Sequence, residues 1–212
     1  MNANLSDLTI VVDRSGSMES IRTDAEGGLN HLIDEQKKAP GNCNLTLVQF
    51  DNQYECVHSG VRVADVPKFT LVPRGGTALL DAVGRAVNET GARLAAMREE
   101  DRPANVIFVI VTDGGENASR EFTKSKVSEM VKRQTEAYKW KFTYIGANQD
   151  AFAEAAKMGI SRDATLLYAA NAAGTRSAYK AVSDAVLMAC AAPDAEISYS
   201  AEARAKAVDS VN

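Results

Sequence analysis

The sequence has 212 residues, of which 45% are hydrophobic and 25% charged, and a formal net charge of −4 at pH 7. This length and composition predict one globular domain with enough apolar side chains for a sizeable core. The mild negative charge argues against a nucleic-acid-binding protein, which needs a basic surface to neutralise phosphates.

The three cysteines, Cys43, Cys56 and Cys190, are odd in number and widely spaced, which argues against a disulfide framework. The segment from Met1 to Asp7 lacks the basic and apolar regions of a signal peptide. No apolar run is long enough to cross a bilayer. We therefore expect a soluble, cytoplasmic protein with reduced thiols and no membrane association.

A short apolar run and a helical stripe make up the first part of the chain. Residues 8–12 are apolar and mostly β-branched, which predicts a buried strand. An apolar stripe at helical spacing runs from Ile21 to Ile33, and Pro40-Gly41 marks the end of this helix. Gly27-Gly28 lowers the helix propensity of this segment, which indicates close packing against a neighbouring element.

Two strands are predicted next, over residues 45–50 and 54–63, joined by a turn at Asp51-Asn52-Gln53. We expect them to form an antiparallel hairpin. With the turn centred on Asn52-Gln53, Gln49 faces Cys56, and Cys43 lies too far from Cys56 for a disulfide.

Helices and strands alternate through the rest of the chain. Gly75-Gly76-Thr77 opens a helix, and residues 106–111 form a continuous apolar run, typical of a central parallel strand. The later elements are, in chain order, a helix capped by Thr123, a strand over 141–146, a short helix over 150–158, a strand over 165–168 and a helix starting near Thr175. We expect one domain over residues 1–192, with 193–212 as a tail or a weak Ala-rich helix.

This alternation predicts an α/β fold of the doubly wound, Rossmann-like type, with helices on both faces of a mostly parallel sheet. Because crossovers between parallel strands are right-handed, the six strands take the spatial order 3-2-1-4-5-6. The third strand is an antiparallel edge. Strand order reverses between the first and fourth strands, and ligands of open α/β sheets bind at such a switch point.

Oxygen-bearing side chains follow the strands that meet at this switch point. Asp13, Ser15 and Ser17 follow the first strand, Asp113 follows the fourth, and Thr77 begins the helix that precedes the fourth strand. Taken alone, the stretch 13–17 is typical of a strand-to-helix turn, because Asp and Ser are favoured N-cap residues. Two carboxylates and three hydroxyls in one crevice instead favour a hard cation such as Mg²⁺, Mn²⁺ or Ca²⁺.

The pattern Asp13-x-Ser15-Gly16-Ser17, Thr77 after two glycines, and Asp113 followed by glycine resembles the metal-ion-dependent adhesion site (MIDAS) of von Willebrand factor A (VWA) domains. The resemblance covers residues 5–191, and the stretch 112–123 is similar to small stand-alone members from bacteria and phages. It implies a Mg²⁺ (or Mn²⁺) ion bound by the five motif residues.

The resemblance also implies a partner protein whose Asp or Glu completes the metal shell. In stand-alone bacterial relatives this partner is often an AAA-type ATPase or another protein from the same gene cluster. Candidate rim residues of the partner surface are Arg14, Met18, Arg74, Glu116 and Asn148. Each of these five residues is also explained by a structural or solvated role.

Two other functions compete with this interpretation. A Mg²⁺-dependent phosphohydrolase or phosphotransferase would use the same acidic crevice. Such sites commonly place a carboxylate two positions after the first aspartate, where this chain has Ser15, and neither His31 nor His58 is an evident general base. Dinucleotide binding predicts a Gly-rich turn after the first strand, and Gly16 is a single glycine. We therefore expect a binding module with no catalytic residues and not an enzyme.

Overall fold

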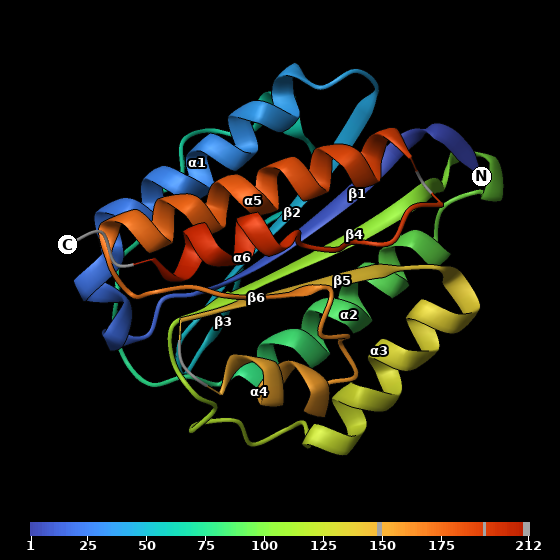
Figure 1. The fold of residues 1–212 in the computed structure, drawn as a ribbon. Coiled ribbons are helices and arrows are strands. Elements are labelled where there is room, and N and C mark those ends of the chain that lie inside the picture. The colour runs from blue at the N-terminus through green and yellow to red at the C-terminus, as the bar shows by residue number, and fades with distance from the viewer. Residues whose placement is uncertain (148–149, 193, 210–212) are drawn as a thin grey trace.

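The computed structural model describes residues 1–147, 150–192 and 194–209. At its centre is a six-stranded sheet with the spatial order β3-β2-β1-β4-β5-β6 (Figure 1). In chain order the strands are β1 (Asn2–Asp13), β2 (Asn42–Phe50), β3 (Tyr54–Arg62), β4 (Pro103–Thr112), β5 (Lys141–Gly146) and β6 (Thr165–Leu167). β3 pairs antiparallel with β2, and all other pairings are parallel. The predicted strand order and antiparallel edge are confirmed.

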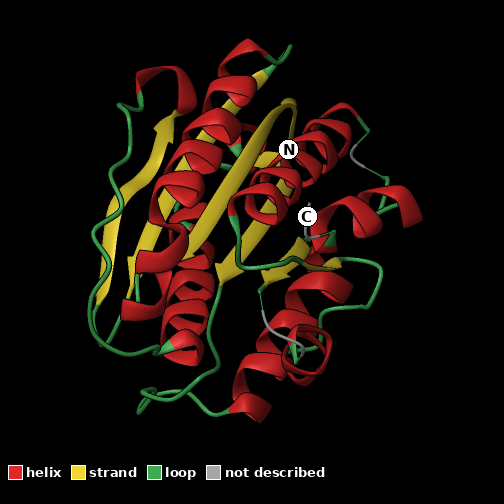
Figure 2. Ribbon diagram, turned by 60° about the vertical axis from the view of Figure 1, so that its left-hand side comes forward, coloured by secondary structure: helices red, strands yellow, loops and turns green. Residues whose placement is uncertain are grey.

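Helices cover both faces of the sheet, and Figure 2 shows the sheet enclosed between them. One face carries α1 (Arg22–Lys38), α5 (Ala172–Ala191) and α6 (Ala201–Val208). The other face carries α2 (Leu79–Ala95), α3 (Lys124–Tyr138) and α4 (Ala151–Lys157). The predicted doubly wound α/β fold is therefore confirmed.

The two central strands are β1 and β4, whose side chains are buried on both faces. Residues 106–111 of β4 are at most 4% exposed, and β1 is buried without interruption from Ser6 to Asp13. Both strands are longer than their apolar runs. Backbone pairing extends them to Asn2 and Pro103, because ladder hydrogen bonds do not require apolar side chains.

Two helix starts depend on capping side chains. Thr123 accepts a hydrogen bond from the backbone N–H of Lys126 at 3.3 Å, which confirms the predicted cap of α3. α5 begins at Ala172, before the expected Thr175, because the side chain of Asn171 accepts from the backbone N–H of Gly174 at 2.8 Å.

The β2–β3 hairpin forms as predicted, but its register differs. Gln49 lies opposite Glu55, so the expected pairing of Gln49 with Cys56 is wrong. The turn centres on Asn52 itself and not on the Asn52-Gln53 peptide, which moves the pairing by one residue. All three cysteines are free thiols.

The segment after α5 folds back onto the domain. Ile197, Tyr199 and Ala207 are buried, and the hydroxyl of Tyr199 lies 2.6 Å from that of Thr143 on β5. Ser200 caps α6 by accepting from the backbone N–H of Ala203. Of the two expectations for this segment, a tail or a helix, residues 201–208 form the helix.

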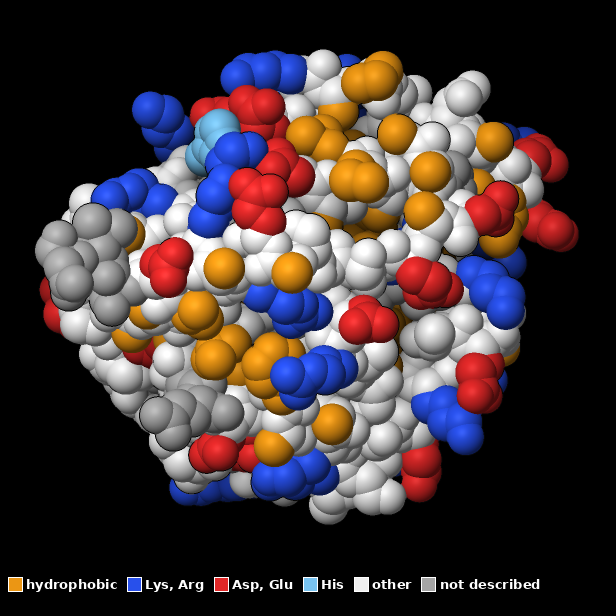
Figure 3. Space-filling model, viewed as in Figure 1, with side chains coloured by type: hydrophobic (Ala, Val, Ile, Leu, Met, Phe, Trp, Pro, Cys, Tyr) orange, Lys and Arg blue, Asp and Glu red, His pale blue; other side chains and the backbone are white. Residues whose placement is uncertain are grey.

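Charge is mixed over the face of the molecule drawn in Figure 3, where acidic and basic side chains alternate among apolar ones. No helix within the described residues combines the length and the apolar character that crossing a bilayer requires.

Gly27 and Gly28 of α1 have different surroundings. A Cβ atom at Gly28 would lie 2.5 Å from Cγ and 2.7 Å from Cβ of Tyr179 on α5. A Cβ atom at Gly27 would meet no atom within 4 Å. The predicted close packing is therefore found at Gly28, where the backbone of α1 touches α5.

We predict that Gly28→Ala lowers the free energy of unfolding by about 2 kcal/mol, because Tyr179 and the two helices must shift to admit the methyl group. Gly27→Ala is the matched control and should raise it by roughly 0.5 to 1 kcal/mol, since Ala is the better helix former. Urea unfolding followed by circular dichroism measures both values. Equal effects of the two substitutions would contradict the close contact.

Candidate metal site

The site is built on the loop that follows β1. The carboxylate of Asp13, at the end of this strand, accepts the backbone N–H of Ser15 at 2.6 Å and the hydroxyl of Thr112 at 2.5 Å. Gly16 donates its N–H to the carbonyl of Gly75 at 3.1 Å, which joins this loop to the one that precedes α2. Asp13 is therefore fixed in position by its own loop and by the end of β4.

The serine hydroxyls extend from this loop towards the second carboxylate. Ser15 Oγ lies 3.1 Å from Ser17 Oγ, and Ser17 Oγ donates to Asp113 Oδ1 at 2.6 Å. A Cβ atom on Gly114 would lie 3.4 Å from Thr77 Oγ1 and 3.5 Å from Ser17 Oγ, so these two hydroxyls border the same small space. The structure thus brings the predicted oxygen ligands Asp13, Ser15, Ser17, Thr77 and Asp113 together.

Two residues that position these groups were not singled out in the sequence. Thr112 bonds to Asp13 and accepts the N–H of Gly114 at 3.1 Å. Asn117 accepts the backbone N–H of Thr77 at 2.9 Å, and its own N–H donates to the carbonyl of Thr77. Thr112 could have been identified in the sequence, because it is a hydroxyl residue at the end of an otherwise apolar strand. The role of Asn117 depends on a loop conformation that the sequence pattern does not predict.

Burial makes the two carboxylates costly to ionise. Asp13 has no exposed surface, and burial raises its pKa to about 6. Hydrogen bonds from Thr112 and Ser15 offset part of this increase, and the negative charge of Asp113 adds to it. Burial also raises the pKa of Asp113, where the bond from Ser17 acts in the opposite direction.

Exposure differs across the site. Asp13, Ser15 and Thr77 are buried, whereas Ser17 is exposed and Asp113 is half-buried. The site is therefore closed on the side of the sheet and open to solvent beside Ser17 and Asp113.

The donor set fits a hard divalent cation. It consists of two carboxylates and three hydroxyls, and oxygen-only ligands suit Mg²⁺ and Mn²⁺. The described part of the chain contains no group of three or more His, Cys, Asp or Glu residues able to bind a metal. In the same residues, no Lys or Arg forms an ion pair with Asp13 or Asp113. A bound cation would balance this buried negative charge.

Two of the predicted rim residues are wrong because they are buried. Arg14 is 4% exposed, and its guanidinium donates to Asp51 at 3.0 Å and to Glu55 at 2.6 Å. It connects the loop after β1 to the β2–β3 hairpin. Met18 is fully buried, because the 3₁₀ turn Gly16–Ile21 directs its apolar side chain into the core.

The other three rim candidates differ in exposure and in their contacts within the protein. Arg74 is exposed and donates to Asp51 at 2.6 Å, so it remains a rim candidate. The carboxylate of Glu116 accepts the N–H of Leu80 at 2.9 Å and that of Ser119 at 2.7 Å, which gives it a structural role at the start of α2. Asn148 lies outside the described residues.

Comparison with known proteins gives matches at the level of structure. No protein-family model matches the sequence, and it has no significant match among curated proteins. Proximal thread matrix protein 1 from the mussel byssus, solved with a zinc-occupied MIDAS motif, is similar with a TM-score of 0.60 and 19% identity. That match covers 87% of this chain but only 46% of the mussel protein.

Two further solved structures are similar. The von Willebrand factor domain of the pili tip protein Mfa5 from Porphyromonas gingivalis has a TM-score of 0.60 and 10% identity, over 87% of this chain and 96% of that one. Manganese-loaded TRAP protein of Plasmodium vivax has a TM-score of 0.53 and 18% identity, over 80% of this chain and 70% of that one.

The fold and the oxygen site place the chain in the class of open α/β proteins with a candidate ligand site at the switch point of the sheet. The structural matches assign it more narrowly: the chain has the von Willebrand factor A fold.

We predict a pH dependence that comes from Asp13. In metal-free protein its raised pKa means that the folded state holds this proton more tightly than the unfolded chain, so ionisation lowers stability between about pH 4 and about pH 6. The full effect is about 3 kcal/mol. Asp13→Asn should remove this contribution and leave a smaller decline from Asp113, whose pKa is also raised; urea unfolding in EDTA at several pH values measures both.

Asp184→Asn, an exposed change on α5, is the matched control and should leave the decline in place. A wild-type protein without this decline, or an Asp13→Asn variant that keeps all of it, would contradict the assignment.

Proposed function

We propose that the chain is a metal-dependent protein-binding module. Mg²⁺, or Mn²⁺, bound by Asp13, Ser15, Ser17, Thr77 and Asp113 would act as a Lewis acid that accepts a carboxylate from a partner. The protein's own residues hold and orient the ion from the closed side. The open side next to Ser17 and Asp113 leaves access for the partner's Asp or Glu.

The hydrogen bond from Ser17 Oγ to Asp113 Oδ1, at 2.6 Å, is the observation that carries this proposal. It joins residues that are 96 positions apart in the sequence and that lie in the segments following two neighbouring strands. Through Ser15, the same contact continues to the loop of Asp13. A set of oxygen donors gathered from distant segments, with one buried and one half-buried carboxylate, supports a cation site over simple helix capping.

The solved structures support the proposal at the level of the fold. One has a zinc-occupied MIDAS motif and another is loaded with manganese. This chain has the same fold and presents its oxygen ligands at the switch point of that fold.

The proposal assigns no catalytic residue. Ser15 stands where a phosphohydrolase of this general type would have a second carboxylate. Its hydroxyl lies 3.1 Å from that of Ser17, which donates to Asp113. The two histidines lie on α1 and β3, outside the loops that form the site. No observation therefore favours the phosphohydrolase alternative.

We predict that Mg²⁺ stabilises the wild-type protein by about 2.7 kcal/mol when its concentration is a hundred times Kd. Thr77→Ala removes a ligand and should abolish most of this gain, which thermal unfolding with Mg²⁺ and with EDTA measures. Thr23→Ala, an exposed change on α1, is the matched control and should keep the full gain. Equal Mg²⁺ stabilisation of Thr77→Ala and wild type would contradict the ligand set.

The partner is tested separately, by affinity capture from the native host with the full chain as bait. We expect a protein with an exposed acidic segment, and propose an AAA-type ATPase or another protein from the same gene cluster. It should be retained by wild type and Thr23→Ala in Mg²⁺, and lost in EDTA and with Thr77→Ala. Capture that is unaffected by EDTA and by Thr77→Ala would contradict metal-dependent binding.

A further inference from the structure

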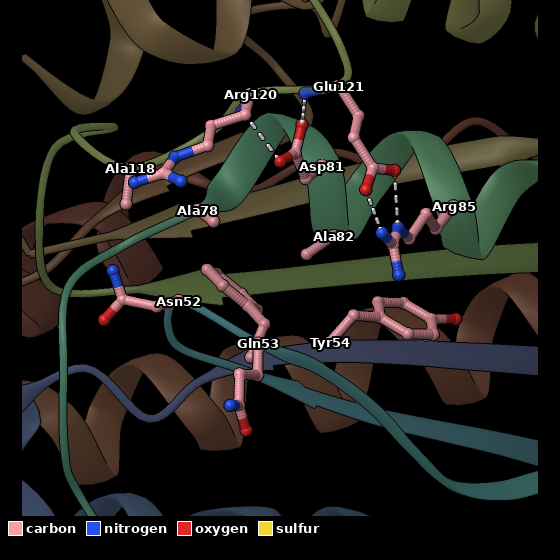
Figure 4. A pocket seen from close by; sticks show the side chains of 11 residues that line it. Asn52, Gln53, Tyr54, Ala78, Asp81, Ala82, Arg85, Ala118, Arg120 and Glu121 are labelled. Atoms are coloured by element: carbon pink, nitrogen blue, oxygen red, sulfur yellow. Dashed lines mark hydrogen bonds and ion pairs between the residues drawn. The ribbon is translucent and has the colours of Figure 1, made fainter.

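A pocket lies beside the candidate metal site, between the β2–β3 turn and the segment that follows Asp113 (Figure 4). Its floor includes Phe50, Ala78 and Ala82, which are at most 6% exposed. The cavity volume is 270 Å³, below the range of pockets for drug-sized ligands. It has room for one amino-acid side chain.

The pocket and the metal site share a wall. Ala78, in the pocket floor, directly follows the ligand Thr77. Ala118 lines the pocket and donates its N–H to the carbonyl of Thr77 at 3.2 Å. Asn52, on the opposite side, accepts the N–H of Gly76 at 2.6 Å. The pocket therefore directly adjoins the segment that carries the candidate ligand Thr77.

The two carboxylates that line the pocket are already bound within the protein. Asp81 accepts the backbone N–H groups of Arg120, Glu121 and Phe122 at 2.8 to 2.9 Å. Glu121 forms a two-bond ion pair with Arg85, and Figure 4 shows this pair and the bonds from Arg120 and Glu121 to Asp81. Asp81 therefore uses most of its acceptor capacity within the protein, and the charge of Glu121 is paired with that of Arg85.

The amide oxygens of the lining are also used. Asn52 Oδ1 accepts from Gly76, and Gln53 Oε1 accepts from Arg74 at 3.4 Å. Among the described residues, Asn52 Nδ2 has no hydrogen-bond acceptor, so it is left as a donor. Each amide or carboxylate group of this lining thus already accepts at least one hydrogen bond from the protein.

Arg120 supplies the main unused donor. Its backbone N–H bonds to Asp81, but within the described residues its guanidinium has neither a hydrogen bond nor an ion pair. In Figure 4 this guanidinium extends over Ala78 towards Ala118, which is the end of the pocket nearest Thr77. A positive charge with free donors therefore lies in the pocket lining, next to Ala118 and Ala78.

We propose that this pocket receives a second carboxylate of the partner, close in its sequence to the one that completes the metal shell. The inference rests on the proposed function and specifies its partner as an acidic pair. The guanidinium of Arg120 binds this carboxylate through two parallel N–H bonds, and Asn52 Nδ2 adds a third donor. The methylene groups of a glutamate lie against Ala78 and Ala82.

The same lining excludes a basic side chain at this position. A lysine would place its charge next to Arg120, and the carboxylates of the lining are already paired with Arg85 or with backbone N–H groups. Repulsion from Arg120 and the loss of hydration both oppose binding of a lysine. The pocket therefore favours acidic side chains and also disfavours basic ones. The metal selects one acidic residue, and the pocket selects the second.

Short random peptides displayed on phage test this inference. They are selected on the immobilised full chain in Mg²⁺ and eluted with EDTA, for wild type, Arg120→Glu and Arg133→Glu. Arg133 is exposed on α3 and gives the matched change of charge. We expect wild type and Arg133→Glu to enrich peptides with two nearby acidic residues. Arg120→Glu should enrich peptides with one acidic and one basic residue.

A synthetic peptide with the wild-type consensus should bind Arg120→Glu about tenfold more weakly or worse, and its remaining binding should still need Mg²⁺. Enrichment of the same acidic pairs by Arg120→Glu, or of single acidic residues by wild type, would overturn the inference while leaving metal-dependent binding intact. If EDTA releases no peptide from wild type, the proposed function fails, and the inference fails with it.

Discussion

Two carboxylates held at the ends of neighbouring strands are the constraint on which this structure depends. Asp13 ends β1 and Asp113 follows β4, and these two strands pair in parallel at the centre of the sheet. Parallel pairing brings the carboxyl ends of both strands to the same edge. Burial opposes ionisation of both groups and raises the pKa of each, and at Asp13 the negative charge of Asp113 adds a smaller increase.

The surrounding loops are arranged to hold this charge without neutralising it. Arg14 and Arg74, the cations of the adjoining loops, both pair with Asp51 and not with the site carboxylates. Thr112, Ser15 and Ser17 contribute hydroxyl or N–H donors instead. The protein thus orients the two carboxylates with neutral groups and leaves their charge available, which is the arrangement that a divalent cation requires.

Much of the fold could be predicted from the sequence, because it depends on patterns that act over short stretches. The apolar runs 8–12 and 106–111 identified the central strands, and right-handed crossovers then determined the strand order. That order placed the five candidate ligands at one edge. The hairpin register was missed because it depends on the position of the turn to within one residue.

The direction and burial of individual side chains at the site were harder to predict. Arg14 and Met18 occupy loop positions that appear solvated in the sequence, yet tertiary contacts bury them against Asp51 and the core. Glu116 was assigned to the rim, but backbone N–H groups at the start of α2 bind it. The free donors of Arg120 could not be predicted from the sequence either. They depend on which side chains the fold places within hydrogen-bond distance of its guanidinium.

The most direct test of this account is the anomalous scattering of Mn²⁺ in crystals grown with the ion. We expect one strong peak about 2 Å from the hydroxyls of Ser15 and Ser17, next to Asp13, Thr77 and Asp113, and its loss in crystals of Thr77→Ala. Crystals that contain Mn²⁺ with no peak at this position, or with a peak that Thr77→Ala leaves unchanged, would contradict the central claim.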